Sequence, residues 1–271
     1  MNLNNIVIAG EGGQGIQTIA KILSSALFEQ GKEVSYLPSF GVEQRGAPSV
    51  AYISISDQPL RYSKFEKADY AVILQSRAIK SVENYISPNT NIIFDSSTIR
   101  AADLPKHSAR LFGIPATKYA HEKFTQKSFN LIILGYLSSI FGLPEKEIWS
   151  EINLTLGKKF KSEEIKKLSR DAFIFGREAV PEKDQFSEAL FRPSHRAIVY
   201  KNETKTAGIS PARCKGCAVC ITKCPVGALR FGQDLGVYST PVPEIDLEKC
   251  ILCGNCHNFC PDSAINVTRN N

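Results

Sequence analysis

The stretch CKGCAVCITKCP, residues 214–225, recurs 36 residues later as CILCGNCHNFCP, residues 250–261. Both copies have the pattern C-x-x-C-x-x-C-x-x-x-C-P, and together they contain all eight cysteines of the 271-residue chain. The first 213 residues contain no cysteine. Cysteines confined to one repeated segment of a chain with no secretion signal favour metal binding over disulfides.

The spacing within each copy predicts two 4Fe–4S clusters. Three thiolates at intervals of three residues bind one cluster, and the fourth cysteine, followed by proline, binds the other cluster. On this rule, one cluster binds Cys214, Cys217, Cys220 and Cys260, and the other binds Cys250, Cys253, Cys256 and Cys224. Residues 212–271 are therefore predicted to form an α+β ferredoxin domain that carries single electrons.

A pair of zinc sites is the alternative, because C-x-x-C pairs also bind tetrahedral zinc. Zinc usually takes its ligands as two pairs, whereas each copy here offers three closely spaced cysteines and one before proline. Small or apolar neighbours of the ligands, such as Ala218 and Leu252, would keep water from a cluster. His257 is expected at the surface, because the cysteines already complete both ligand sets.

Residues 1–180 alternate between apolar strands and amphipathic helices. The predicted strands are 5–9, 34–37, 50–55, 70–74 and 91–95, and the predicted helices are 14–30, 76–85, 128–141, 144–154 and 162–178. This alternation predicts an α/β domain with a Rossmann-like, mostly parallel sheet that is covered on both faces.

Residues 181–211 are polar, contain three prolines, and are predicted to connect the two domains. This connector could be a flexible linker or an arm that lies across a partner subunit. The domain prediction is therefore residues 1–180, a connector at 181–211, and the ferredoxin domain at 212–271.

The stretch GEGGQG, residues 10–15, lies between the first strand and the first helix. It matches G-x-G-x-x-G, in which backbone N–H groups and a helix N-terminus can face an anion. Nicotinamide dinucleotide is disfavoured, because the acid expected after the second strand is missing. Close strand–helix packing alone would also explain the glycines. The candidate ligand-binding residues of this turn are Gly10, Gly12, Gly13, Gln14 and Gly15.

A second candidate feature is SFGVEQRGAP, residues 39–48, which follows the second predicted strand. We expect this loop at the same sheet edge as the glycine turn, where ligands of such sheets bind. Its candidate residues are Glu43, Arg45 and Gly46. The alternative is a solvated loop with a local ion pair between Glu43 and Arg45.

Composition and hydropathy exclude some classes of function. The formal net charge is +6 without a run of like charges, which disfavours nucleic acid as a partner. The longest apolar stretch, residues 129–143, is shorter than the roughly 20 residues that cross a membrane. The N-terminus lacks the pattern of a signal peptide. We therefore expect a cytoplasmic protein that binds no membrane.

Four stretches of the N-terminal part resemble the gamma subunit of the 2-oxoacid:ferredoxin oxidoreductases, a family that includes pyruvate:ferredoxin oxidoreductase. They are GEGGQG (10–15), SFGVEQRGAPSVAYISIS (39–56), FGIPATKYA (112–120) and FNLIILGYLSSIFGL (129–143). Residues 212–271 resemble the delta subunit of the same family. Together the resemblances cover nearly the whole chain apart from the connector, and they indicate a fusion of gamma and delta.

This resemblance implies an oxidoreductase complex that decarboxylates a 2-oxo acid, usually to an acyl-CoA and CO₂, and reduces ferredoxin. Thiamine diphosphate, Mg²⁺ and a further 4Fe–4S cluster would belong to the alpha and beta subunits of this hetero-oligomer. The chain lacks the Gly-Asp-Gly triplet that begins the family's thiamine motif, so no catalytic residue is expected here. The resemblance also allows a CoA site at the glycine turn and the Glu43–Gly46 loop, although some members use no CoA.

Two other functions remain open from the sequence. One is a self-contained iron–sulfur enzyme with a flavin or nicotinamide on the N-terminal domain, against which the missing acid argues. The other is an iron–sulfur sensor. Its charges are dispersed and give no sign of a surface that would recognise DNA or a partner protein. The sequence does not name the 2-oxo acid.

Overall fold

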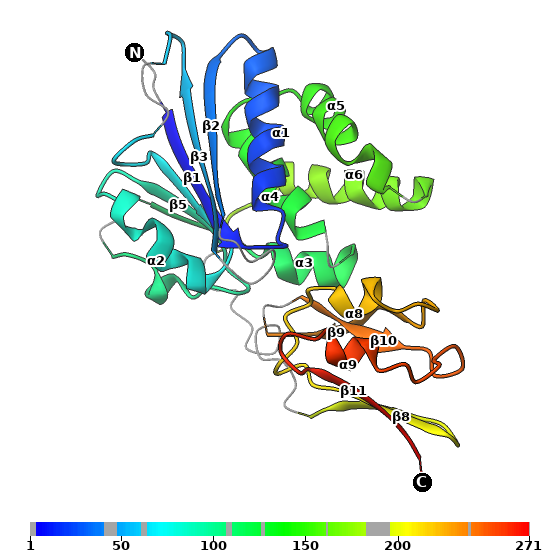
Figure 1. Ribbon diagram of the computed structural model, residues 1–271. Helices are drawn as coiled ribbons and strands as arrows, with labels where there is room; N and C mark the ends of the chain where they lie inside the picture. Colours follow the sequence, from blue (N-terminus) through cyan, green and yellow to red (C-terminus); the bar gives the residue numbers. More distant parts are fainter. Residues whose placement is uncertain are drawn as a thin grey trace. The chain divides into compact units, whose positions relative to one another are not determined.

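The computed structural model describes residues 4–40, 48–60, 64–106, 110–125, 128–160, 162–182, 196–237 and 240–270. These residues form two compact units, one from β1 to α6 and the other from β7 to β11 (Figure 1). None of the helices in the described ranges is both long enough and apolar enough to span a bilayer.

The N-terminal unit contains a six-stranded sheet in the order β2-β3-β1-β4-β5-β6. The strands are β1 (Asn4–Glu11), β2 (Glu33–Phe40), β3 (Pro48–Ser56), β4 (Tyr70–Ile73), β5 (Asn91–Asp95) and β6 (Arg110–Ile114). The predicted mostly parallel sheet is confirmed, and β3 alone runs antiparallel to both of its neighbours. Only seven residues join β2 to β3, and a parallel crossover needs about a dozen.

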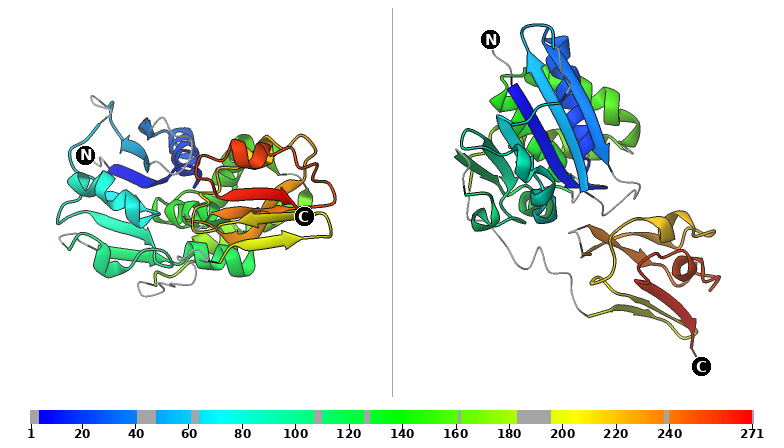
Figure 2. Two further views of the ribbon diagram at one scale, coloured as in Figure 1. Left: turned by 60° about the horizontal axis from the view of Figure 1, so that its bottom comes forward. Right: turned by 60° about the vertical axis from the view of Figure 1, so that its left-hand side comes forward.

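Helices cover both faces of this sheet (Figures 1 and 2). One face carries α1 (Ile16–Glu29), α3 (Ala116–Lys123), α4 (Phe129–Ile140), α5 (Glu145–Leu156) and α6 (Glu163–Arg177). The other carries the segment predicted as one helix at 76–85. It is instead three short pieces, the 3-10 turn Ser76–Ala78, α2 (Ile79–Val82) and the 3-10 turn Glu83–Tyr85, because Val82 has a φ of −123°. Further 3-10 turns lie at Ala101–Asp103 and Gly157–Lys159.

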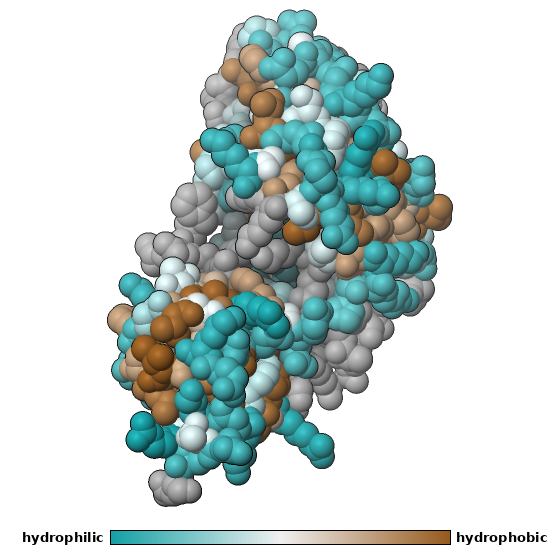
Figure 3. Space-filling view, turned by 90° about the vertical axis from the view of Figure 1, so that its right-hand side faces the viewer, coloured by the Kyte–Doolittle hydropathy of each residue, from teal (hydrophilic) through white to brown (hydrophobic). Residues whose placement is uncertain are grey.

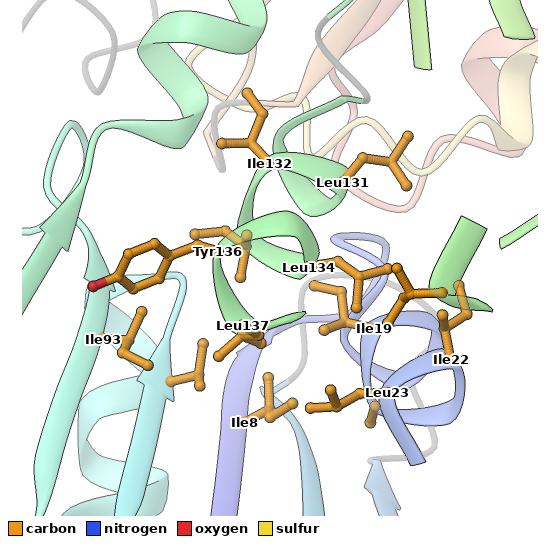
Figure 4. Packing of buried hydrophobic residues seen from close by; sticks show 14 of the residues in the cluster. Ile8, Ile19, Ile22, Leu23, Ile93, Leu131, Ile132, Leu134, Tyr136 and Leu137 are labelled. Carbon is orange, nitrogen blue, oxygen red and sulfur yellow. The ribbon is translucent and has the colours of Figure 1, made fainter. Parts of the chain in front are cut away.

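Alternate residues of the strands point to opposite faces of the sheet and pack into two separate hydrophobic cores. Ile6 and Ile8 of β1 pack under the larger helical layer, whereas Val7 and Ala9 pack against the α2 side. All four are fully buried, as expected for a strand covered on both faces. Figure 4 shows Ile8 below Leu137 of α4 and to the left of Leu23 of α1, and all three belong to the larger core.

Two glycines set how closely α4 and α6 approach. A Cβ on Gly135 of α4 would lie 2.2 Å from the carbonyl oxygen of Phe173, and one on Gly176 of α6 would lie 2.0 Å from that of Ile132. Each glycine therefore faces the backbone of the other helix. This close contact holds the outer helical layer together.

The turn between β1 and α1 is braced from within. The buried Gln14 side chain accepts the Glu11 N–H at 2.8 Å through Oε1, and its Nε2 donates to the Leu74 carbonyl at 3.5 Å. A Cβ on Gly10 would lie 2.5 Å from Ile16 Cδ1, which explains that glycine by packing. Gly15, with φ +79°, is the N-cap of α1, and no side chain caps the helix.

Glu11 ends β1 at this turn with its side chain only 2% exposed. Its Oε1 lies 3.3 Å from Arg77 Nη1, while its buried Oε2 has no hydrogen-bond partner among the described residues. Burial raises the pKa of Glu11 to about 7, and the Arg77 guanidinium opposes that increase only in part. The folded protein thus holds a carboxyl group that is costly to ionise.

The C-terminal unit repeats its structure at the spacing of the cysteine motifs. Its elements are β7 (Ile198–Lys201), β8 (Lys205–Ile209), α8 (Val219–Thr222), β9 (Leu229–Leu235), β10 (Pro241–Ile245), α9 (Asn255–Asn258) and β11 (Ile265–Arg269). Moving β8, α8 and the start of β9 by 36 residues gives β10, α9 and the start of β11. β8 pairs with β11, and β9 pairs with β10, so each half is completed by the other.

The second half of the predicted connector belongs to this unit. Residues 198–201 and 205–209 form β7 and β8, which pair with each other and, through β8, with β11. β11, the other partner of β8, lies about sixty residues further along the chain, so no local pattern indicated this pairing.

Replacement of Gly176 by Ala should destabilise the N-terminal unit by about 1–3 kcal/mol, because its methyl group would meet the backbone of Ile132. The only tryptophan, Trp149, packs 6.0 Å from Phe173 of α6 and reports unfolding by its fluorescence. Gly157→Ala is the matched control, since nothing lies within 4 Å of its Cβ position. Equal denaturation midpoints for the two variants would contradict this close helix contact.

Glu11→Gln should change how stability depends on pH. Burial raises the pKa of Glu11 from its ordinary value of 4.5 to about 7, so the folded state binds the proton of this carboxyl group more tightly than the unfolded state does. Its contribution is therefore present below pH 4.5 and is lost as the pH rises towards 7. In the Gln variant, stability should no longer fall between pH 4.5 and pH 7 on account of this group. At pH 8 the variant should be more stable than the wild-type protein by about 2–3 kcal/mol. The exposed Glu29→Gln is the control, and an unchanged slope in Glu11→Gln would refute the burial argument.

Candidate iron–sulfur centre

The eight cysteines surround two cavities in the sets that the crossed rule predicts. Cys214, Cys217, Cys220 and Cys260 line one cavity, called the first site. Cys224, Cys250, Cys253 and Cys256 line the other, called the second site. Each set takes three cysteines from one copy of the motif and one from the other copy.

The two sites are copies of each other in most of their walls. Ile209, Ala264 and Ile265 of the first site correspond, at an offset of 36, to Ile245, Ala228 and Leu229 of the second. These side chains are buried and apolar in both sites. Such walls exclude water from a bound cluster, which helps to set its potential.

The backbone repeats as well. Left-handed conformations occur at the corresponding pairs Gly216 and Leu252, Ala218 and Gly254, and Gly227 and Ser263. Ala218 and Gly254 begin the one-turn helices α8 and α9, which carry the third cysteine of each motif. Leu252, Ala218 and Ser263 adopt φ angles that non-glycine residues rarely have, so the loops are held in a shape set by the site.

Backbone N–H groups donate to the cysteine sulfurs. The N–H of Ala228 lies 3.2 Å from Cys224 Sγ, and the N–H of Ala264 lies 3.2 Å from Cys260 Sγ. The N–H of Leu252 lies 3.5 Å from Cys250 Sγ. Donors of this kind stabilise negative sulfur and so favour thiolates that bind iron.

Burial disfavours free thiolates at these positions. It raises the pKa of the Cys214 thiol to about 11 and that of Cys220 to about 12, and neighbouring cysteines add to the increase. Burial also raises the pKa of Cys256. Iron binding therefore displaces thiol protons, and the metal supplies the positive charge that the walls lack.

The cysteine sets fit a cubane better than a single ion. Within the described part of the chain, no three His, Cys, Asp or Glu side chains converge where one metal ion would bind. A 4Fe–4S cluster needs no such convergence, because each of its four thiolates binds a different iron. His257 is exposed, as predicted, and its Nδ1 lies 3.1 Å from the Ile265 carbonyl oxygen.

The rims of the two sites differ in polarity. Lys215 and Asp262 form an ion pair of 3.5 Å beside the first site, where the second site has Ile251 and Val226. Ile251 is 59% exposed, and Cys253 is the exposed cysteine of the second site. Brown, hydrophobic residues also gather on the face of the C-terminal unit seen in Figure 3.

The other predicted site residues belong to the N-terminal unit. Gly10 lies near the end of β1, and Gly12, Gly13, Gln14 and Gly15 form the turn between β1 and α1. Glu43, Arg45 and Gly46 lie outside the described residues, so the predicted proximity of their loop to this turn stays a prediction.

Two residues that the sequence analysis did not single out lie at these sites, one at the glycine turn and one at the second cysteine site. Glu11 lies within the GEGGQG stretch, and its acidic side chain directly after an apolar strand was the available signal. Lys205 of β8 donates to the carbonyl of Cys250 across 45 residues of sequence, for which no local pattern exists.

Comparisons with known proteins agree with this division of the chain. Residues 5–179 match the family model "Pyruvate ferredoxin/flavodoxin oxidoreductase", and residues 213–264 match the model "4Fe-4S dicluster domain". The 2-oxoglutarate synthase subunit KorC of Archaeoglobus fulgidus is 33% identical over 176 residues, which is 64% of this chain and 88% of KorC. The pyruvate synthase subunit PorC of Methanothermobacter marburgensis is 35% identical over 136 residues, or 49% of this chain and 75% of PorC.

Solved structures share the fold. A chain of the 2-oxoglutarate:ferredoxin oxidoreductase from Magnetococcus marinus gives a TM-score of 0.59 at 22% identity, with 74% of this chain and 35% of that chain covered. The pyruvate oxidoreductase subunit PORC from Thermotoga maritima gives 0.54 at 22% identity, over 66% of this chain and 97% of that chain. With a family model that spans most of its length, this chain belongs to the pyruvate ferredoxin/flavodoxin oxidoreductase family.

Proposed function

We propose that this chain is the fused gamma and delta subunit of a 2-oxoacid:ferredoxin oxidoreductase and conducts electrons through two 4Fe–4S clusters. The observation that carries the proposal is the pair of matching four-cysteine sites in a chain whose N-terminal unit belongs to this family. Relatives named as KorC and PorC are themselves subunits of such enzymes, which supports a role within a larger complex.

In this proposal each set of four cysteines holds one cluster, and the bound clusters take up and release single electrons. The N–H groups of Ala228 and Ala264 stabilise the sulfurs of Cys224 and Cys260. The apolar walls keep water away, and the crossed ligation keeps the two sites within one small unit. The residues of this chain thus determine where the clusters bind and which positions can accept an electron.

The oxidative decarboxylation would take place on alpha and beta subunits that hold thiamine diphosphate, Mg²⁺ and a further 4Fe–4S cluster. External ferredoxin would accept the electrons, and the complex would be a cytoplasmic hetero-oligomer. In this arrangement residues 1–180 form the gamma-like domain and residues 212–271 the delta-like domain. The strands β7 and β8 supply an additional sheet edge to the latter.

A finer part of the proposal is that the glycine turn contributes to a site for CoA. The N-terminus of α1 has no side-chain cap and no acidic residue in its first turn, so its N–H groups suit the phosphates of an anionic ligand. Glu11 lies directly before this turn, and its buried Oε2 has no hydrogen-bond partner among the described residues.

An anaerobic pull-down of the full chain from its own host tests the main proposal. We expect two further subunits, thiamine diphosphate, and iron in excess of the roughly eight atoms that two clusters contain. The purified complex should then reduce viologen with at least one 2-oxo acid. A chain that elutes alone with a yellow chromophore would instead identify a self-contained flavin enzyme.

Cys220→Ser within this complex should remove the first-site cluster. The rate of viologen reduction should then fall by at least about tenfold, because the electron path is interrupted. The N-terminal unit should keep its fold, as judged by Trp149 fluorescence. His257→Ala, an exposed change beside Cys256, is the matched control and should retain activity. Full viologen reduction by the Ser variant would rule out a path through the first site.

Gly12→Val should crowd the turn and raise the KM for CoA of the assembled complex by about tenfold or more, with a smaller effect on kcat. The physical reason is that Val would add a branched side chain to the turn that precedes the uncapped N-terminus of α1. Gly157→Val is the comparison, because nothing lies within 4 Å of the Cβ position of that glycine and its φ of −52° suits any residue. An unchanged KM for CoA in an intact complex would remove this turn from the CoA site.

A further inference from the structure

The two cysteine sites differ in the group that binds one equivalent carbonyl. In the first site, the Cys214 carbonyl accepts the neutral N–H of Val237 at 2.9 Å. In the second site, the Cys250 carbonyl accepts a hydrogen bond from the Lys205 ammonium at 2.7 Å. Gly236 permits the first arrangement, since a Cβ there would lie 2.1 Å from the Cys214 oxygen. The backbone around the two carbonyls otherwise repeats, because Cys214 and Cys250 each donate to the residue four positions earlier.

Lys205 is a fixed cation. Its Nζ donates to the Leu247 carbonyl at 2.8 Å as well as to Cys250, and both contacts are partly buried. Within the described ranges no carboxylate forms an ion pair with it. The nearby Lys249 differs, because it is 64% exposed and pairs with Asp246 at 3.2 Å. At the first site, the charge of Lys215 is likewise offset by Asp262.

Reduction of a 4Fe–4S cluster adds one negative charge. A cation without a neutralising carboxylate, in partly buried surroundings, stabilises the reduced form more than a neutral donor does, because solvent screens it weakly. Position 241, which corresponds to Lys205 at the first site, is a proline and provides no such charge.

We propose that Lys205 raises the reduction potential of the second-site cluster above that of the first-site cluster, so that electrons collect at the second site. This inference rests on the proposed function, because it requires both clusters to be present. Lys205 is a positioning residue in this scheme: it acts through the loop of Cys250 and by its charge, and it binds no iron. Lys205 lies in β8, within the segment that the sequence predicted as a connector, so this segment would influence the potential of the second-site cluster.

The test is an EPR-monitored redox titration of the anaerobically purified full chain, with iron and sulfide content measured alongside. The wild-type chain should show two clusters at different potentials, and a Cys253→Ser chain identifies which signal belongs to the second site. Lys205→Met should lower the second-site potential by about 59 mV, which corresponds to a tenfold change in the one-electron reduction equilibrium. The first-site potential should stay unchanged.

Three further variants separate charge from structure. Lys205→Arg keeps the charge and should retain the higher potential, whereas Lys205→Gln keeps a donor without charge and should lower it. Lys249→Met removes a paired, exposed charge next to Cys250 and should change neither potential. A purely structural role for Lys205 would alter iron content or melting temperature and leave the potentials in place.

Each outcome decides between the claims. A wild-type chain whose clusters titrate together, or a higher potential at the first site, would overturn the assignment even if the Lys205 variants failed to fold. Neutral variants with both clusters and unchanged potentials would also overturn it. A chain that takes up no iron–sulfur cluster would overturn the proposed function as well.

Discussion

The crossed pairing of the C-terminal unit is the constraint on which the rest depends. β8 pairs with β11 and β9 with β10, and each cysteine site takes its fourth cysteine from the opposite copy of the motif. Neither copy can complete a site or a sheet by itself. Folding and cluster binding should therefore be coupled, since each supplies the geometry that the other needs. The same crossing keeps both sites in one small unit, as electron transfer requires.

Because the backbone of the two sites repeats, their differences must come from side chains. The left-handed residues and the N–H donors to sulfur recur at an offset of 36. What does not recur is charge: Lys215 and Asp262 at one rim stand against Ile251 and Val226 at the other. A duplicated domain can thus hold two similar clusters and still distinguish them through a few substitutions around a common frame.

The sequence predicted those features that depend on local spacing. Cysteine intervals predicted which four cysteines line each cavity, and apolar periodicity predicted most strands and helices of the N-terminal unit. Features that depend on distant pairing were not predicted. The antiparallel pairing of β3 with β1, the pairing of β8 with β11, and the contact of Lys205 with Cys250 all join residues that lie far apart in the sequence. β6 was missed because only its last two residues, Gly113 and Ile114, are buried, and α3 was missed because it buries only Ala116 and Ala120.

Two buried carboxylates of the N-terminal unit show how structural and candidate functional groups can be told apart. Asp95 ends β5, and both of its oxygens accept hydrogen bonds, from Ser97 N–H at 3.1 Å and from Thr117 N–H at 3.0 Å, which ties the start of α3 to the sheet. Glu11 ends β1 with one oxygen unpartnered. A buried carboxylate that costs stability without completing a network is difficult to explain by folding alone. Its place in the glycine turn therefore favours a role in binding for that edge of the sheet.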